Sequence, residues 1–408
     1  MWLRSLYYVK KSFDTLKLTK EELSKFQNRR LSHILESADT SSIYDNFGPD
    51  SYSNEEFSEL PIIDSEFLSK SAESFENSYE RRTSGTEGQP IKVRFTEQAH
   101  DWLSALYVRS LYIQEYQFGL DIVQHEDEMT DQRTWIGKKA MPKKYVDPKS
   151  SIDDQIEVLS ENDPEVISYF PQTLVAICKK LSDIDNVQLD PQLVLTYGEP
   201  LTESTREYIE ETLNAPVRDN YATTEFGTVA WECPEGGYHI AEDSVHAEIL
   251  DEDQESVSQG EIGQLVLTGL VNDAIPLIRY NIGDLVENGG NSCGCDTEFK
   301  KIKKIKGRKE NVIKNAEGNF VFPDEIIDKI VSIEEIIMFQ IEAEDDKYIF
   351  RYVQSKDFSK EDRNKVRDIL RSKFSLEPVE IKKVDYIPCT SGGKLRLIIN
   401  NQTSKIKY

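Results

Sequence analysis

Helical and strand patterns alternate in the middle of the chain, and this alternation constrains the fold more than any other feature of the sequence. Residues 152–160 and 172–183 have helical patterns. An apolar run at 193–200 ends in Gly-Glu-Pro and precedes a third helical segment at 203–214, which Thr202 is suited to cap. Strands that alternate with helices at this spacing are typical of α/β layers, so we predict an α/β fold.

Further elements are predicted on both sides of this region. They are helices at 19–37, 97–118 and 360–373, and strands at 245–250, 263–268, 335–342, 348–353 and 379–387. Thr19 and Glu22 have the spacing of a capping box at the start of the first helix. The strands after residue 330 surround a single helix, which indicates a small α+β unit at the end of the chain.

The charge distribution places a domain boundary near residue 300. A chain of 408 residues exceeds what one hydrophobic core usually holds. Residues 301–408 contain 23 Lys and Arg against 18 Asp and Glu, so they carry +5, while residues 1–300 carry −30. We therefore predict a large, multi-layered N-terminal domain at 1–306 and a small, mobile α+β domain at 307–408.

The composition argues against several classes of protein. A net charge of −25 disfavours a nucleic-acid partner. The sequence has no run of about 18 apolar residues, so we expect no membrane span. The N-terminus is too polar and aromatic for a signal peptide, and the five cysteines do not suggest a disulfide framework. We expect a cytoplasmic protein.

A stretch rich in glycine and hydroxyl groups at 82–90 is the first candidate binding motif. Glycines allow the backbone N–H groups to approach an anion, and the hydroxyls add donors for phosphate oxygens. The stretch lacks the Gly-Lys-Ser/Thr ending of a Walker loop, which disfavours a P-loop enzyme. A phosphate-binding loop and an ordinary hydrophilic hairpin turn both remain open from this stretch alone.

Four later stretches carry chemistry of their own, at 219–227, 278–284, 306–314 and 388–396. In the first, Glu225 follows hydroxyl residues, a combination that can hold Mg²⁺ against a phosphate. In the second, Asp284 follows a Gly turn and can accept both hydroxyls of a ribose. The third lies at the charge boundary, and the fourth is a Gly turn that presents Lys394. Each stretch alone is also compatible with an ordinary turn.

Together and in this order, the five stretches resemble the motifs of the adenylate-forming superfamily of acyl-CoA synthetases, peptide-synthetase adenylation domains and luciferases. The resemblance extends from about residue 20 to about residue 400. It is closest to phenylacetate–CoA ligases and their capsule-biosynthesis relatives. The short length, the segment 60–63, Gly198-Glu199-Pro200 and the segment 276–280 support this choice.

The resemblance implies a set of site residues. The implied nucleotide-binding residues are Thr83, Ser84, Gly85, Thr86, Gly88, Gly198, Glu199, Pro200, Asn220, Tyr221, Thr223, Asp284 and Arg308. The implied catalytic residues are Lys394, Glu225 and Thr224, with Glu225 as the Mg²⁺ ligand. Glu310 stands at the position of the hinge, where the family usually has aspartate.

The resemblance also implies a two-step reaction. The carboxylate of an organic acid, expected to be an aryl acid, attacks the α-phosphate of ATP to give an acyl-adenylate and pyrophosphate. The acyl group then passes to CoA or another thiol, such as that of a carrier protein, after the C-terminal domain rotates about Glu310. Lys394 would neutralise charge in the first step.

Two alternatives stay open at the level of sequence. An amide synthetase would use the same adenylate with an amine acceptor. A catalytically inactive sensor of nucleotide or acid would keep the fold, and two departures motivate it. Glu87 stands where the family loop usually has a second threonine, and Gln89 replaces a frequent lysine.

Two short Cys/His clusters predict a structural zinc site. Cys233 and His239 flank a Gly turn, and Cys293 and Cys295 form a second close pair. Four nitrogen and sulfur ligands suit tetrahedral Zn²⁺, and four filled positions suit a structural rather than a catalytic metal. Some relatives of phenylacetate–CoA ligase are similar here. The alternative is two unrelated turns with free thiols.

Overall fold

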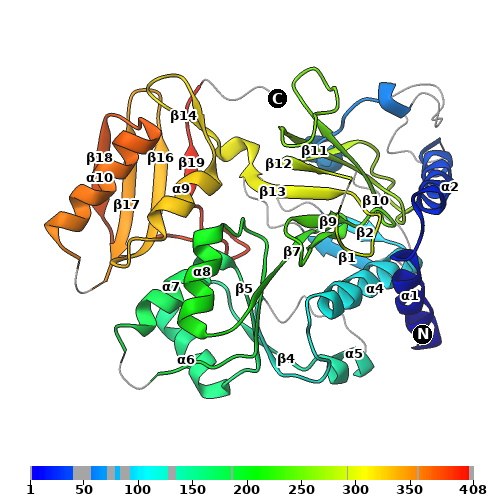
Figure 1. The fold of residues 1–408 in the computed structure, drawn as a ribbon, viewed down its shortest axis with the longest axis horizontal. Helices are drawn as coiled ribbons and strands as arrows, with labels where there is room; N and C mark the ends of the chain where they lie inside the picture. Colours follow the sequence, from blue (N-terminus) through cyan, green and yellow to red (C-terminus); the bar gives the residue numbers. More distant parts are fainter. Residues whose placement is uncertain are drawn as a thin grey trace. The chain divides into compact units, whose positions relative to one another are not determined.

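The computed structural model shows two compact units, each built from two segments of the chain (Figure 1). The first unit comprises residues 1–115 and 220–305, and the second comprises 116–219 and 306–407. The structure describes residues 2–39, 57–70, 79–82, 92–126, 135–184, 187–291, 293–355 and 358–403. The predicted domain division at 306/307 stays a prediction, although one boundary between the units falls beside it.

Strands in the order β10-β11-β12-β13-β9-β8-β7 lie in the first unit, except that the first residues of β7 and the last residues of β13 belong to the second. Their bounds are β7 Val217–Thr223, β8 Gly227–Glu232, β9 Tyr238–Ile240, β10 Val245–Leu250, β11 Ile262–Gly269, β12 Tyr280–Gly290 and β13 Lys301–Arg308. The pairs β7/β8, β8/β9, β9/β13, β10/β11 and β11/β12 are antiparallel. The strands predicted at 245–250 and 263–268 are confirmed, because alternating and apolar runs of this length fit buried strands.

Helices and a hairpin complete the first unit. They are α1 Trp2–Thr15, α2 Lys20–Asp39, α3 Ser65–Lys70, α4 Glu97–Ile113 and the hairpin of β1 Tyr79–Arg82 with β2 Lys92–Phe95. The backbone N–H of Thr19 donates to Glu22 at 2.9 Å, so the predicted capping box is present. Helix α4 is confirmed but ends at Ile113 rather than residue 118. Helix α1 was not anticipated from the sequence.

A buried ion pair joins three elements of the first unit. Arg109 of α4 donates to Asp243 at 2.6 Å, and neither side chain is more than 1% exposed. Arg109 also donates to the carbonyl of Ser12 at 2.6 Å, and Thr15 donates to Asp243 at 2.5 Å. These directed bonds hold α1 and α4 in one arrangement on the segment that follows β9.

The second unit begins with parallel strands in the order β6-β5-β3-β4. Its elements up to β7 are β3 Ile122–His125, α5 Trp135–Ala140, β4 Lys143–Val146, α6 Ile152–Asn162, β5 Val166–Tyr169, α7 Pro171–Leu181, β6 Leu193–Tyr197 and α8 Glu203–Leu213. The predicted helices and the strand of this region are confirmed, with Thr202 accepting from Thr205 N–H at 3.2 Å as a cap. Cys178 is buried in α7, as expected for a packing residue.

The C-terminal part of the second unit is a four-stranded sheet with two helices. The strand order is β18-β17-β16-β19. The elements are η4 Lys309–Asn311, β14 Ile313–Lys314, β15 Phe320–Val321, α9 Pro323–Ile330, β16 Ile336–Ala343, β17 Tyr348–Gln354, α10 Lys360–Phe374, β18 Val379–Lys383 and β19 Ile398–Asn400. The α+β prediction is confirmed here, but β18 ends at Lys383 rather than residue 387.

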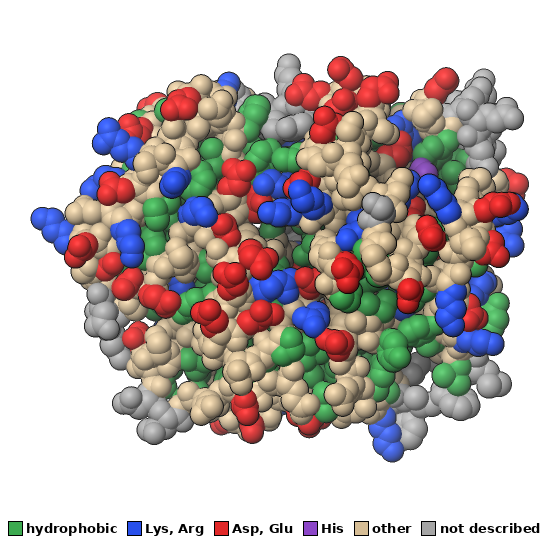
Figure 2. Space-filling view, viewed as in Figure 1, with side chains coloured by type: hydrophobic (Ala, Val, Ile, Leu, Met, Phe, Trp, Pro, Cys, Tyr) green, Lys and Arg blue, Asp and Glu red, His purple; other side chains and the backbone are tan. Residues whose placement is uncertain are grey.

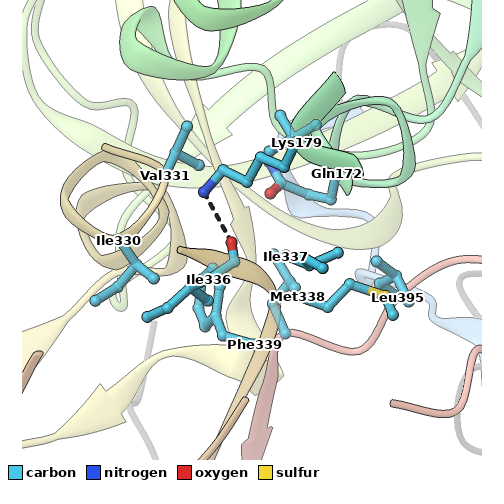
Figure 3. A pocket seen from close by; sticks show the side chains of 11 residues that line it. Gln172, Lys179, Ile330, Val331, Ile336, Ile337, Met338, Phe339 and Leu395 are labelled. Carbon is cyan, nitrogen blue, oxygen red and sulfur yellow. Dashed lines mark hydrogen bonds between the residues drawn. The ribbon is translucent and has the colours of Figure 1, made fainter. Parts of the chain in front are cut away.

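A buried lysine joins α7 to the segment between α9 and β16 (Figure 3). The Nζ atom of Lys179 donates to the carbonyls of Ile333 and Ile336, each at 2.8 Å, and the residue is 2% exposed. Burial lowers the pKa of Lys179 to about 8, although Glu334 and Glu335 act to raise it. Apolar side chains of Val331 and other residues surround this lysine in the same small pocket.

Surface features follow the composition. Asp and Glu side chains are interspersed with Lys and Arg over the visible face in Figure 2, so the net charge of −25 does not form one acidic field there. Among the helices in the described part of the chain, none combines the length and the apolar character needed to cross a membrane.

Candidate functional site

Two of the motifs predicted from the sequence meet in the first unit. Tyr221 lies in β7, and its hydroxyl donates to Asp284 Oδ2 in β12 at 2.5 Å. The hydroxyl of Tyr280, at the start of β12, donates to Glu225 Oε1 at 3.2 Å. The stretches 221–227 and 280–284 therefore form one cluster, although about sixty positions separate them in the sequence.

A tight turn places Glu225, one of the two carboxylates of this cluster. The β7–β8 hairpin brings Thr223 opposite Gly227, and Thr223 Oγ1 accepts from the N–H of Phe226 at 3.2 Å. Thr224 and Glu225 therefore occupy the tip of the hairpin, where both are partly buried. Gly227 has a φ of +67°, a conformation that favours glycine.

The cluster offers oxygen atoms suited to a nucleotide and a hard cation. Glu225 and the neighbouring threonine hydroxyls are the ligand types that Mg²⁺ prefers. The amide oxygen of Asn220 in β7 is buried and has no hydrogen-bond partner among the described residues. A buried polar atom of this kind usually needs a partner, and an adenine amine could supply one. The roles predicted for these residues remain predictions.

Lys394 lies in the second unit, against the end of strand β6. Gly198 has a φ of +77°, and a Cβ there would lie 3.2 Å from Lys394 Cε and 3.0 Å from the ring of Phe170. Lys394 Nζ lies 5.8 Å from the centre of that ring. We expect Lys394 to be exposed until the C-terminal domain closes, and in this structure it is partly buried. Gly198 has no side chain, which leaves room for the stem of the lysine.

We call residues 388–396 the lysine loop, and a tight turn shapes it. The N–H of Thr390 donates to the carbonyl of Lys394 at 2.8 Å, and the N–H of Gly393 donates to Thr390 at 2.9 Å. Gly393 has a φ of +82°, and a Cβ there would lie 2.0 Å from Pro148 Cβ. Only glycine therefore fits this close approach to Pro148.

Glu199 binds the lysine loop rather than standing apart as a turn residue. Its Oε1 accepts from the N–H of Leu395 at 3.1 Å, and its Oε2 accepts from the N–H of Gln172 at 3.2 Å. Burial raises the pKa of Glu199 to about 7, while Lys394 and the two backbone N–H groups act to lower it. The sequence analysis assigned Glu199 to the nucleotide and did not anticipate these contacts.

The predicted hinge lies at the end of β13. Gly307 has a φ of +104°, and a Cβ there would be 3.3 Å from Pro323 and 3.6 Å from Pro200. Arg308 Nε lies 3.5 Å from Glu310 Oε1, so the predicted nucleotide-binding arginine and the predicted hinge residue form an ion pair. A partly exposed pair of this kind is weak and can exchange partners.

Aromatic residues beside Lys394 were missed by the sequence analysis. His125 stacks on Tyr169 with ring centres 4.5 Å apart, and it meets Phe170 edge-on at 4.9 Å. Phe170 in turn meets Tyr197 edge-on at 5.1 Å. Burial lowers the pKa of His125 to about 3, so its imidazole is neutral at physiological pH. No short sequence pattern joins these residues, because they come from three strand ends.

The predicted phosphate loop lies outside the described residues. Thr83, Ser84, Gly85, Thr86 and Gly88 therefore keep their sequence-based assignment, as do the departures at Glu87 and Gln89.

The four predicted metal ligands come together in the first unit. One ligand atom from each of Cys233, His239, Cys293 and Cys295 lies within 4.8 Å of the others. Cys233 Sγ is 3.5 Å from Cys293 Sγ, and His239 Nε2 is 3.0 Å from Cys295 Sγ. Donor atoms at these separations fit the corners of a tetrahedron around one Zn²⁺ ion.

The surroundings of this cluster favour metal binding. His239 Nδ1 lies 2.8 Å from the carbonyl of Phe299, a contact that leaves Nε2 directed at the sulfur atoms. Burial lowers the pKa of His239, so its imidazole is in the neutral form that binds metals. Cys233 directly follows β8, His239 lies in β9, and Cys293 and Cys295 lie in the segment before β13, so an ion here would link the β8–β9 hairpin to that segment.

Two curated relatives match part of the chain. Protein CapK of Staphylococcus aureus is 30% identical over 254 residues, which cover 60% of this chain and 55% of CapK. The phenylacetate-coenzyme A ligase of Thermus thermophilus is 30% identical over 191 residues, which cover 45% of this chain and 42% of the ligase. The chain thus spans about half the length of the curated relatives that it matches. No protein-family model matches it.

A solved structure shares the fold over nearly the whole chain. It is 2-hydroxyisobutyryl-CoA ligase in the postadenylation state with R3-HIB-AMP, which aligns with a TM-score of 0.78 and 16% identity over 95% of this chain and 91% of that chain. The chain therefore has the fold of the acyl-CoA ligases of the adenylate-forming superfamily. It is also similar in sequence to phenylacetate–CoA ligase and CapK, which confirms the resemblance read from its motifs.

Proposed function

We propose that this chain is an AMP-forming acid–CoA ligase, which converts a carboxylic acid and ATP to an acyl-adenylate and then transfers the acyl group to CoA. The observation that carries the proposal is the cluster of Tyr221, Asp284, Tyr280 and Glu225. This cluster brings together the two stretches, 219–227 and 278–284, that the sequence analysis predicted to bind the same nucleotide. The sequence similarity to phenylacetate–CoA ligase and the shared ligase fold support the same activity.

In the proposed first step, the substrate carboxylate attacks the α-phosphate of ATP and pyrophosphate leaves. Lys394 offsets the negative charge that builds between the two anions, which is the main task when positioning and electrostatics dominate catalysis. Asp284 accepts the ribose hydroxyls. When bound, Mg²⁺ would neutralise phosphate charge, and Glu225 with Thr224 would hold it.

We propose an aryl acid as the substrate. The ring of Phe170 lies beside Lys394, and it belongs to a cluster with His125, Tyr169 and Tyr197. Aromatic rings pack well against one another. A relative is named for phenylacetate, which also supports an aryl group. The relative is also named for coenzyme A, which supports CoA as the acceptor. No similar relative reported above is named for a carrier protein or an amine.

We further propose that Cys233, His239, Cys293 and Cys295 hold one structural Zn²⁺ ion. The arrangement of four donor atoms within 4.8 Å supports this proposal. All four tetrahedral positions would be filled by protein, so the ion would stabilise the first unit rather than take part in the reaction.

Pyrophosphate release by the purified chain tests the function. The chain is mixed with ATP, Mg²⁺ and a panel of aryl and aliphatic acids, and CoA is added afterwards. We expect release that depends on an acid, and a thioester with AMP once CoA is present. No release with any acid, together with no calorimetric binding of millimolar ATP, would instead support the inactive sensor.

A variant links the activity to the described cluster. Asp284→Asn keeps a hydrogen-bond acceptor for Tyr221 but removes the charge that binds ribose, so KM for ATP should rise roughly tenfold or more. The exposed Asp253→Asn is the matched control and should behave as the wild type. An unchanged KM for ATP in Asp284→Asn would mean that this cluster does not bind the nucleotide.

A further inference from the structure

The residue at the N-cap position of helix α7 does not cap the helix with its side chain. Phe170 precedes the helix and makes no side-chain capping bond. The N–H of Gln172 in the first turn instead donates to Glu199 Oε2 at 3.2 Å. A carboxylate at this end of a helix also interacts favourably with the helix dipole. Glu199 therefore takes the place of an N-cap residue from a distance of 27 positions along the chain.

The second oxygen of the same carboxylate binds the lysine loop. Glu199 Oε1 accepts from the N–H of Leu395 at 3.1 Å, and Leu395 directly follows Lys394. Gln172 and Leu395 both line the pocket in Figure 3. One carboxylate thus bridges α7 and the lysine loop, two elements that are more than two hundred positions apart.

The contacts on either side of this bridge leave Lys394 little freedom. The stem of Lys394 packs against Gly198, where a Cβ would lie only 3.2 Å from Lys394 Cε. On the other side of the turn, Gly393 packs against Pro148. A hydrogen bond to the neighbouring backbone amide would therefore fix where the lysine head lies.

From this geometry we propose that Glu199 is a positioning residue, which docks the lysine loop and so places Lys394 for adenylation. This inference rests on the proposed function for the role of Lys394. It gives Glu199 a task that differs from the nucleotide contact implied by sequence. The ionised form is the better acceptor for two N–H donors and attracts Lys394, so adenylation should need Glu199 ionised.

Hydrogen exchange tests the docking without relying on activity. In Glu199→Gln the amide side chain has one oxygen and loses its charge, so it cannot serve both N–H groups. We expect the segment 388–396 to exchange roughly tenfold faster or more than in the wild type. The matched control is Glu203→Gln, an exposed acid at the start of α8, which should leave this exchange unchanged.

Kinetics test the consequence for the reaction. Glu199→Gln should lower the rate of adenylation at least tenfold while the Kd for ATP and the thioester step from preformed acyl-adenylate stay within about twofold. The wild-type rate should fall as the pH drops through about 7, which is the pKa of Glu199, and the variant should lack this fall. Among the described groups, Lys394 is the charge that acts on Glu199, and α7 offers it only the neutral N–H of Gln172.

Two results would overturn the inference. The first is unchanged exchange of 388–396, and the second is a weakened Kd for ATP with normal exchange, which would make Glu199 a nucleotide contact. If the wild type adenylates no acid, the proposed function fails while the exchange experiment still decides the docking. If Glu199→Gln does not fold, Glu199→Asp decides instead, because its shorter side chain should lose one of the two bonds and speed the same exchange.

Discussion

At the scale of the residue, Lys394 is the charge that we propose for adenylation, and its neighbours define its position. Its stem lies beside Gly198 and its Nζ lies 5.8 Å from the centre of the Phe170 ring. It is only partly buried, so the fold loses little when the side chain is shortened. This separates its contribution to the reaction from its contribution to stability.

Lys394→Ala should lower the adenylation rate by roughly 10²–10³, because one charge contact to the transition state is lost. The melting temperature should stay within a few degrees of the wild type. The thioester step from preformed acyl-adenylate should be nearly unaffected. Lys383→Ala, an exposed lysine in β18, is the control. Adenylation at the wild-type rate would show that the lysine loop is wrongly assigned.

At the scale of the element, Lys179 of α7 makes hydrogen bonds inside a largely apolar contact between α7 and the residues around the start of β16. Its ammonium group on α7 binds the carbonyl of Ile333, before β16, and the carbonyl of Ile336, the first residue of β16. Its pKa of about 8 lies below the usual 10.5 because of burial. The unfolded chain therefore holds this proton more tightly than the folded protein. The free energy of unfolding should rise with pH between about 8 and 10.5.

Urea unfolding of the wild type and of Lys179→Met measures this effect. The difference in unfolding free energy, wild type minus variant, should increase by about 2 kcal/mol between pH 7.5 and pH 10. Lys180→Met, which removes the neighbouring lysine on the same helix, is the matched control. A constant difference for Lys179→Met would mean that Lys179 titrates in the same way in the folded and unfolded chain.

The second prediction at this scale concerns the proposed zinc site of Cys233, His239, Cys293 and Cys295. Freshly purified protein should contain one equivalent of zinc by elemental analysis, and Cys293→Ser should lose it. Cys389→Ser, outside the cluster, should keep it. Removing the ion should lower the melting temperature of the protein without abolishing adenylation in molecules that remain folded. Metal-free wild-type protein would refute the site.

At the scale of the whole molecule, the proposed reaction needs two arrangements of the C-terminal part. In this proposal the lysine loop would serve the first step, and the second step would require that the loop move away so that the acceptor can reach the acyl-adenylate. We propose that Glu310 in η4 is where the backbone changes conformation. Its ion pair with Arg308 is partly exposed, so it opposes such a change only weakly.

Glu310→Pro should slow thioester formation at least about tenfold, because proline fixes one backbone dihedral at the proposed hinge. Adenylation should remain close to the wild-type rate, since the conformation for that step is retained. Glu310→Ala keeps the backbone free and serves as the control. Equal slowing of both half-reactions by proline would place the hinge elsewhere or give Glu310 a different role.

The sequence alone was sufficient for features that depend on near neighbours. The capping box of Thr19 and Glu22, the helix that begins at Glu97 and the strand Val245–Leu250 all follow from periodicity and capping chemistry. The four candidate metal ligands could also be predicted from the sequence, because metal ligands often occur in close pairs along the chain. The order of the motifs indicated a resemblance to the superfamily, which the sequence similarity to phenylacetate–CoA ligase and CapK and the shared ligase fold confirm.

Only the tertiary structure decided which distant groups touch. Tyr221 and Asp284 are 63 positions apart, and Glu199 and Leu395 are 196 positions apart. The burial of Lys179 and the aromatic cluster around His125 likewise depend on how strands and helices pack. Periodicity shows which face of an element is apolar, but not which other element covers it. Long-range contacts depend on that choice, because they form only when the whole chain has packed.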